Sequence, residues 1–452
     1  MIPLPFAAGK TYAVFGLART GRSVCAALTA SGARVLAWDD GDAARAQPLG
    51  AAALVDLYQS DLEGCAALVV APGVPLTHPA PHPLVLRARA AGIPVIGDIE
   101  LFAQARQSLP AHRVVGITGT NGKSTTTALI HHALAACGIP ARLGGNIGLP
   151  VLGEDPLPAG GVYVLELSSF QIDLTLGLAC EVAVMTNLTP DHLDRHGDMA
   201  GYAAAKRRLF EMQTPDGAAV LAQDDHWTAG MAEAVPGRVV KASAQQQLPT
   251  GVSIVAGEVR VDGVPVASQA DWPRLGGPHN AQNAACALGA CLALGAPLDG
   301  LLAAFKRYPG LPHRMEWIAE IGGVAYVNDS KATNPTSTAP ALAAFPGRPI
   351  HWILGGRRKT DELDACLPYL AHVKAAYTIG EAAALYARLL GAQIPVAQAG
   401  TLDVAIEAAS RAAGPGDVVL LSPACASQDQ FRDYEARGEA FRKAVTAMET
   451  AP

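Results

Sequence analysis

One segment, residues 114–127 (VVGITGTNGKSTTT), constrains the fold of this chain more than any other. It begins with a β-branched run typical of a buried strand, continues through a glycine-rich turn and ends in residues that favour a helix. Gly119 and Gly122 allow backbone N–H groups to converge on phosphate oxygens. Lys123 supplies a cation for the terminal phosphates, and Ser124 supplies a hydroxyl for Mg²⁺. This strand–loop–helix unit predicts nucleoside triphosphate binding and leaves the acceptor substrate open.

The 452 residues exceed what one hydrophobic core usually organises, so several domains are expected. Two polar, proline-containing stretches, residues 104–113 and 306–314, are interpreted as linkers. In each block, short apolar runs alternate with helical stretches, which is typical of a parallel, doubly wound sheet. The predicted fold class is α/β with three domains. They are a Rossmann-like N-terminal domain (1–106), a central P-loop ATPase domain (107–308) and a Rossmann-like C-terminal domain (309–452).

The predicted strands are short runs rich in apolar and β-branched residues. They are residues 12–15, 34–38, 67–71, 93–96, 114–118, 163–167, 182–186, 325–328, 350–354, 376–379 and 418–421. The first helix is predicted at residues 22–31, and the section 237–275 is predicted to be rich in strands.

Composition excludes several classes of function. The formal net charge is -6 and no long basic run occurs, so neither nucleic acid nor an anionic membrane surface is an expected partner. No apolar run approaches the roughly 20 residues of a membrane span. The eight cysteines are scattered without a C-x-x-C pair, which predicts buried, reduced thiols. A cytoplasmic protein is therefore expected.

A second glycine-rich turn, residues 16–21 (GLARTG), follows the first predicted strand. Ala18 replaces the middle glycine of a dinucleotide fingerprint, and Asp39 ends the next strand about 20 residues later, where an acid commonly meets a ribose. Binding of a nucleotide diphosphate is favoured here, while NAD binding and a purely structural turn remain alternatives.

Polar side chains follow two strands of the central block. Glu166 ends the predicted strand 163–167, where a carboxylate can hold Mg²⁺ or simply cap a helix. Asp191 and His192 lie in the turn after the next strand, and this matching position favours a metal or phosphate role. Lys206 lies on a predicted helix, and its position alone favours a solvated face.

Further candidates occur later in the chain. Asn280 and Asn283 share one face of a predicted alanine-rich helix, where they can cap the helix or contact a base. Arg314 follows the second linker and is well placed to reach a phosphate. Residues 329–334 (DSKATN) follow the strand 325–328, at the end of a sheet where ligands commonly bind.

Taken in order, these motifs resemble the Mur ligase family over nearly the whole chain. The motifs are GTNGKST, GGNIG (144–148), ELSSFQ (166–171), DHLDRH (191–196), YAAAK (202–206), HNAQN (279–283), HR (313–314), NDSKATN (328–334) and SPACASQDQF (422–431). ELSSFQ and SPACAS-x-DQF resemble the members that add D-glutamate. Such ligases use ATP to activate the carboxylate of UDP-N-acetylmuramoyl-L-alanine as an acyl phosphate, which the amine of D-glutamate attacks, in peptidoglycan precursor synthesis.

The resemblance also implies roles for individual residues. Catalytic roles would fall on Lys123, His192, Lys206 and Lys331. Contacts to ATP would come from Gly119, Thr120, Asn121, Gly122, Lys123, Ser124, Thr125, Asn280, Asn283, Arg314 and Asp329. One Mg²⁺ would be held by Ser124 and Glu166, and a second by His192 and a carbamylated Lys206. The other substrates would contact Arg19, Thr20, Asp39, Gly73, Asn146, Gln171, His192, Thr333, Lys359, Ser427 and Tyr434.

The chain departs from its relatives at three places. Arg357 and Arg358 precede Lys359 where many relatives have Asp-Gly, Tyr434 stands where phenylalanine is common, and Asp40-Gly41 replaces a threonine and an arginine. A sister ligase that adds L-glutamate or glutamylates folate is the alternative enzyme. A nucleotide-binding switch without ligase activity is the alternative from another class. A monomer is expected.

Overall fold

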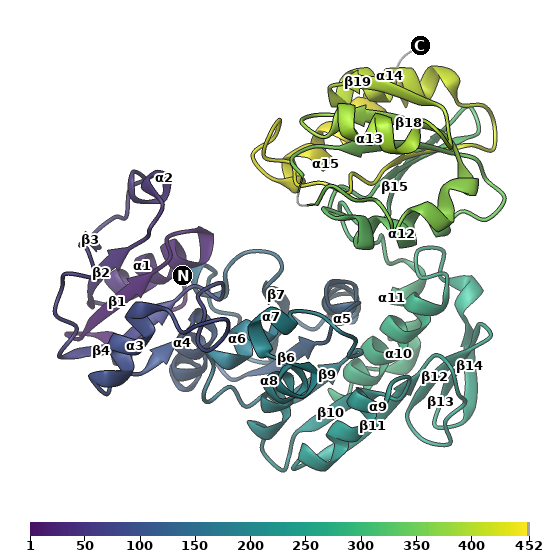
Figure 1. The fold of residues 1–452 in the computed structure, drawn as a ribbon. Coiled ribbons are helices and arrows are strands. Elements are labelled where there is room, and N and C mark those ends of the chain that lie inside the picture. The colour runs from purple at the N-terminus through teal and green to yellow at the C-terminus, as the bar shows by residue number, and fades with distance from the viewer. Residues whose placement is uncertain (359, 450–452) are drawn as a thin grey trace. The chain divides into compact units, whose positions relative to one another are not determined.

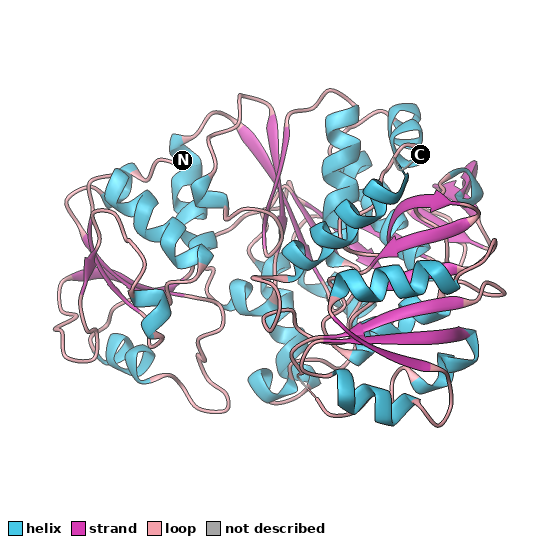
Figure 2. Cartoon of the chain, turned by 90° about the horizontal axis from the view of Figure 1, so that it is seen from above, coloured by secondary structure: helices cyan, strands magenta, loops and turns pink. Residues whose placement is uncertain are grey.

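The computed structural model describes residues 1–358 and 360–449. The chain divides into two compact units, Met1–Tyr308 and Pro309–Pro452, which run from purple to green and from green to yellow in Figure 1. The strands gather into three sheets flanked by helices (Figure 2), and most neighbouring strands are parallel. The predicted α/β class is confirmed.

The first sheet has the strand order β3-β2-β1-β4-β5, and all its pairs are parallel. Its strands are β1 (Thr11–Phe15), β2 (Arg34–Trp38), β3 (Ala53–Leu54), β4 (Cys65–Val70) and β5 (Val95–Ile96). Its helices are α1 (Arg19–Ala30), α2 (Asp42–Arg45), α3 (Pro83–Ala90) and α4 (Asp98–Ala105). The order reverses between β1 and β4, so ligands are expected beside the turn after β1.

This turn requires glycine because the chain folds tightly on itself. A Cβ atom on Gly21 would lie 1.8 Å from the carbonyl oxygen of Gly16, and Gly16 has φ +96°. The helix α1 begins at Arg19, three residues before the predicted start, because the turn leads into it without a break.

The second sheet, in the same unit, has the order β14-β13-β12-β11-β10-β9-β6-β8-β7. Its strands are β6 (His112–Thr118), β7 (Ala141–Gly145), β8 (Gly161–Glu166), β9 (Val182–Met185), β10 (Ala218–Ala222), β11 (Arg238–Ser243), β12 (Val252–Val255), β13 (Glu258–Val261) and β14 (Val264–Ser268). Its helices are α5 (Lys123–Ala136), α6 (Ser169–Asp173), α7 (Leu193–His196), α8 (Met199–Glu211), α9 (His226–Gly230), α10 (Pro278–Ala293) and α11 (Leu298–Lys306). The strands β12, β13 and β14 pair antiparallel, which confirms the strand-rich section.

The connection between the first two sheets is shorter than the predicted linker. Helix α4 ends at Ala105, a 3-10 turn follows at Arg106–Ser108, and β6 begins at His112. Arg106 forms an ion pair with Glu181 at 2.8 Å, and Phe102 packs edge-on against Tyr163 with ring centroids 4.9 Å apart. This polar, proline-containing connection is therefore held in place by side-chain contacts. One hydrophobic core continues from the first sheet to the second.

The third sheet forms the second unit and has the order β15-β16-β20-β17-β18-β19. Its strands are β15 (Glu316–Ile321), β16 (Val324–Asn328), β17 (Ile350–Gly355), β18 (Val373–Ile379), β19 (Val396–Gly400) and β20 (Val418–Leu421). Its helices are α12 (Pro335–Ala343), α13 (Ala383–Leu390), α14 (Leu402–Ala412) and α15 (Tyr434–Glu449). Trp352 and Ile353 of β17 belong to different hydrophobic clusters, so both faces of the sheet are covered.

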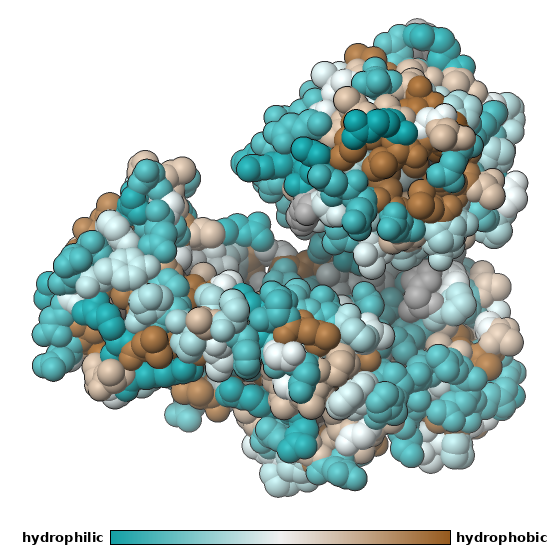
Figure 3. Space-filling model, in the orientation of Figure 1, coloured by the Kyte–Doolittle hydropathy of each residue, from teal (hydrophilic) through white to brown (hydrophobic). Residues whose placement is uncertain are grey.

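The cysteines and the hydropathy of the helices agree with what the composition predicts. All eight cysteines carry reduced thiols, and seven of them are buried. Among the described residues, no helix is long and apolar enough to cross a membrane. The face drawn in Figure 3 is largely hydrophilic on the first unit, with a larger hydrophobic area on the second.

Candidate active site

The phosphate loop, residues 119–125, follows β6 as predicted: residues 119–122 form the turn and residues 123–125 begin α5. Gly119 has φ +144° and Gly122 has φ +80°, conformations that favour glycine. A Cβ atom would lie 2.0 Å from Thr186 Oγ1 at Gly119 and 1.9 Å from Asn283 Oδ1 at Gly122. The loop therefore has no room for side chains at these two positions.

The loop is braced by residues that follow β9. Thr186 Oγ1 donates to the carbonyl oxygen of Asn121 at 2.7 Å, and Asn187 Oδ1 accepts from the Asn121 N–H at 2.9 Å. The N–H of Thr120 donates to the carbonyl oxygen of Asn187, also at 2.9 Å. Sequence reasoning missed Thr186 and Asn187 as parts of the site. Their position at the end of a strand beside β6 is the signal that would have found them.

The lysine of the loop folds back over it. Lys123 Nζ donates to the carbonyl oxygens of Gly119 at 2.9 Å and Thr120 at 2.7 Å, so a cation lies at the mouth of the loop. Ser124 is buried and Thr125 is half-buried at the start of α5. These positions suit a helix N-terminus that receives an anion.

The two asparagines of α10 lie against this loop. Asn283 is buried, and Thr126 Oγ1 of α5 donates to its Oδ1 at 3.5 Å. Asn280 Oδ1 accepts from Asn283 Nδ2 at 3.4 Å, and Asn280 Nδ2 donates to the carbonyl oxygen of Gly276. Of the two, Asn283 therefore has direct contact with the phosphate-loop helix.

Lys206 is buried, contrary to the solvated face that its helical position favoured. Its side chain is 1% exposed, and Nζ donates to Thr118 Oγ1 at 3.1 Å and to the carbonyl oxygen of Gly119 at 2.9 Å. Burial, and next the cation of Lys123, hold the pKa of Lys206 well below its usual value. Lys206 is buried because it lies on the inward face of α8. Tyr202, one helical turn away on the same face, is also buried. An amine of this kind gains nucleophilic character.

Glu166 is buried at the end of β8. Its Oε1 accepts from Asn146 Nδ2 at 3.0 Å, while its Oε2 has no hydrogen-bond partner in the described part of the chain. An orphaned carboxylate oxygen beside a phosphate loop fits a Mg²⁺ ligand. The described residues contain no group of three or more His, Cys, Asp and Glu side chains suited to a metal. Mg²⁺ bound to phosphates needs only one or two protein carboxylates, so this absence is compatible with the assignment.

His192 directly precedes α7 and has a left-handed backbone, with φ 53°. Its Nε2 lies 3.5 Å from Asp191 Oδ2, and its ring centroid lies 6.3 Å from that of Tyr202. Lys206 Nζ in turn lies 4.8 Å from the centre of the Tyr202 ring. The Tyr202 ring thus lies near both His192 and Lys206, the two residues predicted to share a metal.

A polar series that the sequence did not indicate lies beside them. His196 Nε2 lies 2.9 Å from Ser169 Oγ, and its Nδ1 lies 3.8 Å from Asp173 Oδ2. Burial lowers the pKa of His196 to about 4, with further lowering by Lys206, His192 and Arg195. The imidazole is therefore neutral near pH 7 and is held by hydrogen bonding.

The residues predicted for the nucleotide-sugar lie where the first and second sheets meet. Arg19 Nη2 donates to the carbonyl oxygen of Gly148 at 2.5 Å, and Arg195 Nη1 donates to that of Gly73 at 3.0 Å. Thr20 belongs to the first turn of α1. These contacts bring the glycine turn after β1 close to the GGNIG loop.

Two other predicted substrate residues already have structural partners. Asp39 accepts from the N–H of Leu17 at 2.6 Å and from that of Gly41 at 2.7 Å, so its carboxylate holds the glycine turn. Gln171 Oε1 accepts from the N–H and hydroxyl of Ser168 in a capping box.

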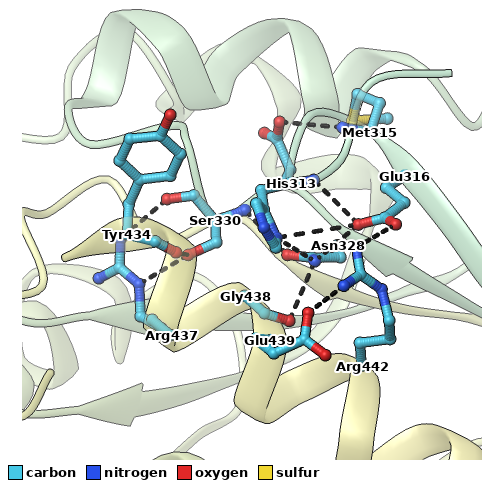
Figure 4. A network of polar contacts seen from close by, with 11 residues as sticks. His313, Met315, Glu316, Asn328, Ser330, Tyr434, Arg437, Gly438, Glu439 and Arg442 are labelled. Atoms are coloured by element: carbon cyan, nitrogen blue, oxygen red, sulfur yellow. Dashed lines mark hydrogen bonds and ion pairs between the residues drawn. The ribbon is translucent and has the colours of Figure 1, made fainter. Parts of the chain in front are cut away.

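In the second unit, Arg314 lies between two residues with left-handed backbones, His313 (φ 61°) and Met315 (φ 46°). This segment is held by a polar network (Figure 4). The N–H of His313 donates to Glu316 Oε2 at 2.9 Å, and Asn328 Nδ2 donates to both Glu316 Oε2 and His313 Nδ1. The exposed Arg314 is therefore presented by a fixed turn.

Asp329 is buried directly after β16. Its Oδ2 accepts from Ser422 Oγ at 2.7 Å, and its Oδ1 accepts from the N–H of Met315 at 3.2 Å. Burial raises the pKa of Asp329 to about 7, although these hydrogen bonds and Arg314 act in the opposite direction.

The predicted amino-acid contacts lie at the carboxyl ends of the third sheet. Lys331 Nζ lies 5.7 Å from the centre of the Tyr434 ring, and Thr333 is half-buried two residues later. Ser427 is buried, and its hydroxyl has no hydrogen-bond partner among the residues that the structure describes. Lys359 lies outside the described residues. An orphaned buried hydroxyl is the kind of group that a ligand satisfies.

The fold and this arrangement define a nucleotide-binding α/β protein with a phosphate loop and an adjacent buried carboxylate. Residues 117–291 match the model of the Mur ligase middle domain, and residues 313–425 match the Mur ligase glutamate ligase domain. The chain belongs to the Mur ligase family.

Curated relatives agree with this membership, and a solved structure shares the fold. The chain is 56% identical to a UDP-N-acetylmuramoylalanine--D-glutamate ligase of Novosphingobium aromaticivorans, over 98% of the chain and 95% of the relative. It is 53% identical to a protein of the same name from Sphingopyxis alaskensis, over 98% of both. The fold resembles that of the UDP-N-acetylmuramate-alanine ligase of Thermotoga maritima, with a TM-score of 0.61 and 17% identity over 97% of this chain and 99% of that one.

Proposed function

We propose that this protein joins D-glutamate to UDP-N-acetylmuramoyl-L-alanine with cleavage of ATP to ADP and phosphate. The full-length similarity to two D-glutamate ligases supports the substrates. The observation that carries the ATP chemistry is the pairing of a phosphate loop with the orphaned carboxylate oxygen of Glu166. The place of the reaction is peptidoglycan precursor synthesis.

The reaction proceeds in two displacements. A carboxylate oxygen of UDP-N-acetylmuramoyl-L-alanine attacks the γ-phosphorus of ATP, the bond from phosphorus to the β,γ-bridging oxygen breaks, and ADP leaves. The amine of D-glutamate then attacks the acyl phosphate carbon and loses a proton. Phosphate departs with the former carboxylate oxygen, and an amide remains. Alignment and charge neutralisation supply most of the catalysis in such transfers.

The phosphate loop would bind ATP through its backbone N–H groups. Gly119, Thr120, Asn121 and Gly122 form the turn, and Ser124 and Thr125 begin the helix. Lys123, whose ammonium already lies over the loop carbonyls, would move to the phosphates and neutralise charge. Asn280, Asn283, Arg314 and Asp329 complete the proposed ATP contacts.

Ser124 and Glu166 would hold one Mg²⁺, which would supply charge neutralisation at the phosphates when bound. A second site would use His192 and a carbamate formed on Lys206. The low pKa of Lys206 supports this, because only the unprotonated amine adds to CO₂. The addition forms an N–C bond and releases one proton, so a cation becomes an anionic ligand. Thr118 and Gly119, now contacts of the amine, would orient the carbamate.

The uridine diphosphate end would lie on the turn after β1, with Arg19, Thr20, Asp39 and Gly73. Asn146, Gln171 and His192 would lie nearer the sugar and the peptide. The bonds of Asp39 to the N–H groups of Leu17 and Gly41 support an indirect role, in which its carboxylate shapes the turn.

D-Glutamate would bind to the second unit. Lys331 and Thr333 would contact the amino acid near the acyl phosphate, while Ser427, Tyr434 and Lys359 would bind its carboxylates. The orphaned hydroxyl of Ser427 supports this assignment. Domains at residues 1–106, 107–308 and 309–452, a monomeric state and a cytoplasmic location complete the proposal, with neither nucleic acid nor membrane as a partner.

The test compares phosphate release with UDP-N-acetylmuramoyl-L-alanine or folate as acceptor, and with D- or L-glutamate as amine. Release that requires the nucleotide-sugar and D-glutamate, with a product of the corresponding mass, supports the proposal. Release with folate or preferentially with L-glutamate would establish the sister activity instead. Nucleotide binding lost in Lys123→Ala, with no product from any acceptor in the wild type, would indicate a switch.

A further inference from the structure

Arg437 of α15 is a buried arginine whose partners are nearly all backbone carbonyl groups. Its side chain is 1% exposed. Nη2 donates to the carbonyl oxygens of Ser330 at 2.9 Å and Cys425 at 3.1 Å, and Nε donates to Ser330 Oγ at 3.0 Å. Nη1 donates to the carbonyl oxygens of Ala426 at 3.3 Å and Gly355 at 3.4 Å. One side chain thus contacts three segments that are distant in the sequence.

These three segments lie at the carboxyl ends of adjacent strands of the third sheet. Ser330 follows β16, Gly355 ends β17, and Cys425 follows β20; in the sheet, β20 lies between β16 and β17. The guanidinium therefore joins three neighbouring strand ends. Packing there is close, since a Cβ atom on Gly356 would lie 2.3 Å from the carbonyl oxygen of Ala426 and 3.1 Å from Arg437 Nη1.

The same segments carry the proposed amino-acid contacts. Lys331 directly follows Ser330, Ser427 directly follows Ala426, and Lys359, which lies outside the described residues, comes four positions after Gly355 in the sequence. Tyr434 begins the helix that carries Arg437, and its carbonyl oxygen accepts from Ser330 Oγ at 2.8 Å. In Figure 4, Ser330 lies beside both Arg437 and Tyr434. Lys331, Thr333 and Ser427 each lie within three residues of an Arg437 partner in the sequence.

A guanidinium is suited to joining several strand ends because its donors lie in a rigid planar fork. Burial lowers the pKa of Arg437 to about 10, so the group keeps its charge near pH 7. A charged donor among carbonyl oxygens forms stronger hydrogen bonds than a neutral one. A lysine at this position would keep the charge but lose the fork.

We infer that Arg437 is a positioning residue: it fixes the three strand-end segments relative to one another and so preforms the subsite for the incoming amino acid. Arg437 does not itself touch that amino acid. This inference rests on the proposed function, which places D-glutamate on these segments.

The test is the Arg437→Lys variant, with Michaelis constants measured for each substrate. The KM for D-glutamate should rise by about tenfold or more, equivalent to about 1.4 kcal/mol. The KM for UDP-N-acetylmuramoyl-L-alanine, whose proposed contacts lie in the first unit, should stay within about twofold. A residue that only stabilised the fold would lower the amount of active enzyme and leave both KM values unchanged.

Arg348 offers a matched control in the same unit. It donates to the carbonyl oxygens of Gly416 at 2.9 Å and Asp417 at 3.2 Å, near the starts of β17 and β20, at the opposite ends of the strands. Arg348→Lys removes two guanidinium–carbonyl bonds of the same kind and should leave the KM for D-glutamate unchanged. An equal rise in both variants would overturn the inference.

A second variant keeps the test decisive if Arg437→Lys does not fold. Ser330→Ala removes one guanidinium contact and the bond to Tyr434, and it should raise the KM for D-glutamate by about threefold to tenfold. An unchanged KM in this variant, or in a folded Arg437→Lys, would overturn the inference. A wild type that uses another amino acid would refute the proposed function instead, and the KM for that amino acid would then carry the same test.

Discussion

Gly122→Ala tests the phosphate loop directly, because two separate costs can be worked out for it. Gly122 has φ +80°, and an alanine in a left-handed conformation costs about 1–2 kcal/mol. The added Cβ atom would also lie 1.9 Å from Asn283 Oδ1, so the Asn283 carboxamide must move. Its contacts with Thr126 and Asn280 would be lost with it.

Gly138 separates these two costs. It lies just beyond the other end of α5 with φ +76°, and a Cβ atom added there would have no other atom within 4 Å. Gly138→Ala should therefore show the backbone cost alone. At about 2–4 °C per kcal/mol, both variants should lose several degrees of Tm.

Only Gly122→Ala should lose affinity for ATP. Hydrogen bonds to charged groups contribute about 1.5–3 kcal/mol, so losing one such phosphate contact weakens binding by roughly 10-fold to 150-fold. Isothermal titration with ATP and Mg²⁺ on both variants and the wild type measures this. Wild-type affinity in Gly122→Ala, or an equal loss in Gly138→Ala, would refute the assignment of the loop.

Three further predictions concern titratable groups. Lys206→Ala should lose nearly all activity and recover part of it with added short carboxylic acids, as measured by phosphate release; full activity without them would refute the carbamate. Glu166→Gln should lower kcat by about 100-fold or more and raise the Mg²⁺ concentration needed for half-maximal rate, because an oxygen ligand and its charge are lost; an unchanged Mg²⁺ requirement would show that Glu166 is structural. Burial raises the pKa of Asp329 from 3.8 to about 7, so its stabilising contribution is present below about pH 4 and is lost as the pH rises toward 7. The Tm of Asp329→Asn relative to wild type should therefore be higher at about pH 8 than at about pH 5, and an equal difference at both pH values would contradict the burial argument.

Strand ends were the most predictable part of this molecule. β2 and β20 have the predicted bounds, and Glu166 and Asp329 lie at strand ends as expected, because short apolar runs there stop at polar residues. β15 and β19 were not predicted. Both form an edge of the third sheet and carry exposed or half-buried residues, so their hydrophobic pattern is weak.

Burial and long-range contacts were the least predictable part. Lys206 looked like a surface lysine because it lies on a predicted helix beside Arg207 and Arg208, and only the packing of α8 buries it. Arg437 gave no local signal, since its partners come from segments up to about 100 residues away. Such contacts depend on the three-dimensional arrangement of strand ends, which a local sequence pattern does not encode.

The central claim is that an amine attacks a carboxylate that has been activated as an acyl phosphate. An oxygen-isotope transfer experiment tests it most directly, with UDP-N-acetylmuramoyl-L-alanine labelled with ¹⁸O in both carboxylate oxygens. The mechanism predicts that each phosphate released with D-glutamate carries one labelled oxygen and that the product amide keeps the other. Unlabelled phosphate, with product still formed, would contradict the acyl phosphate and the mechanism built on it.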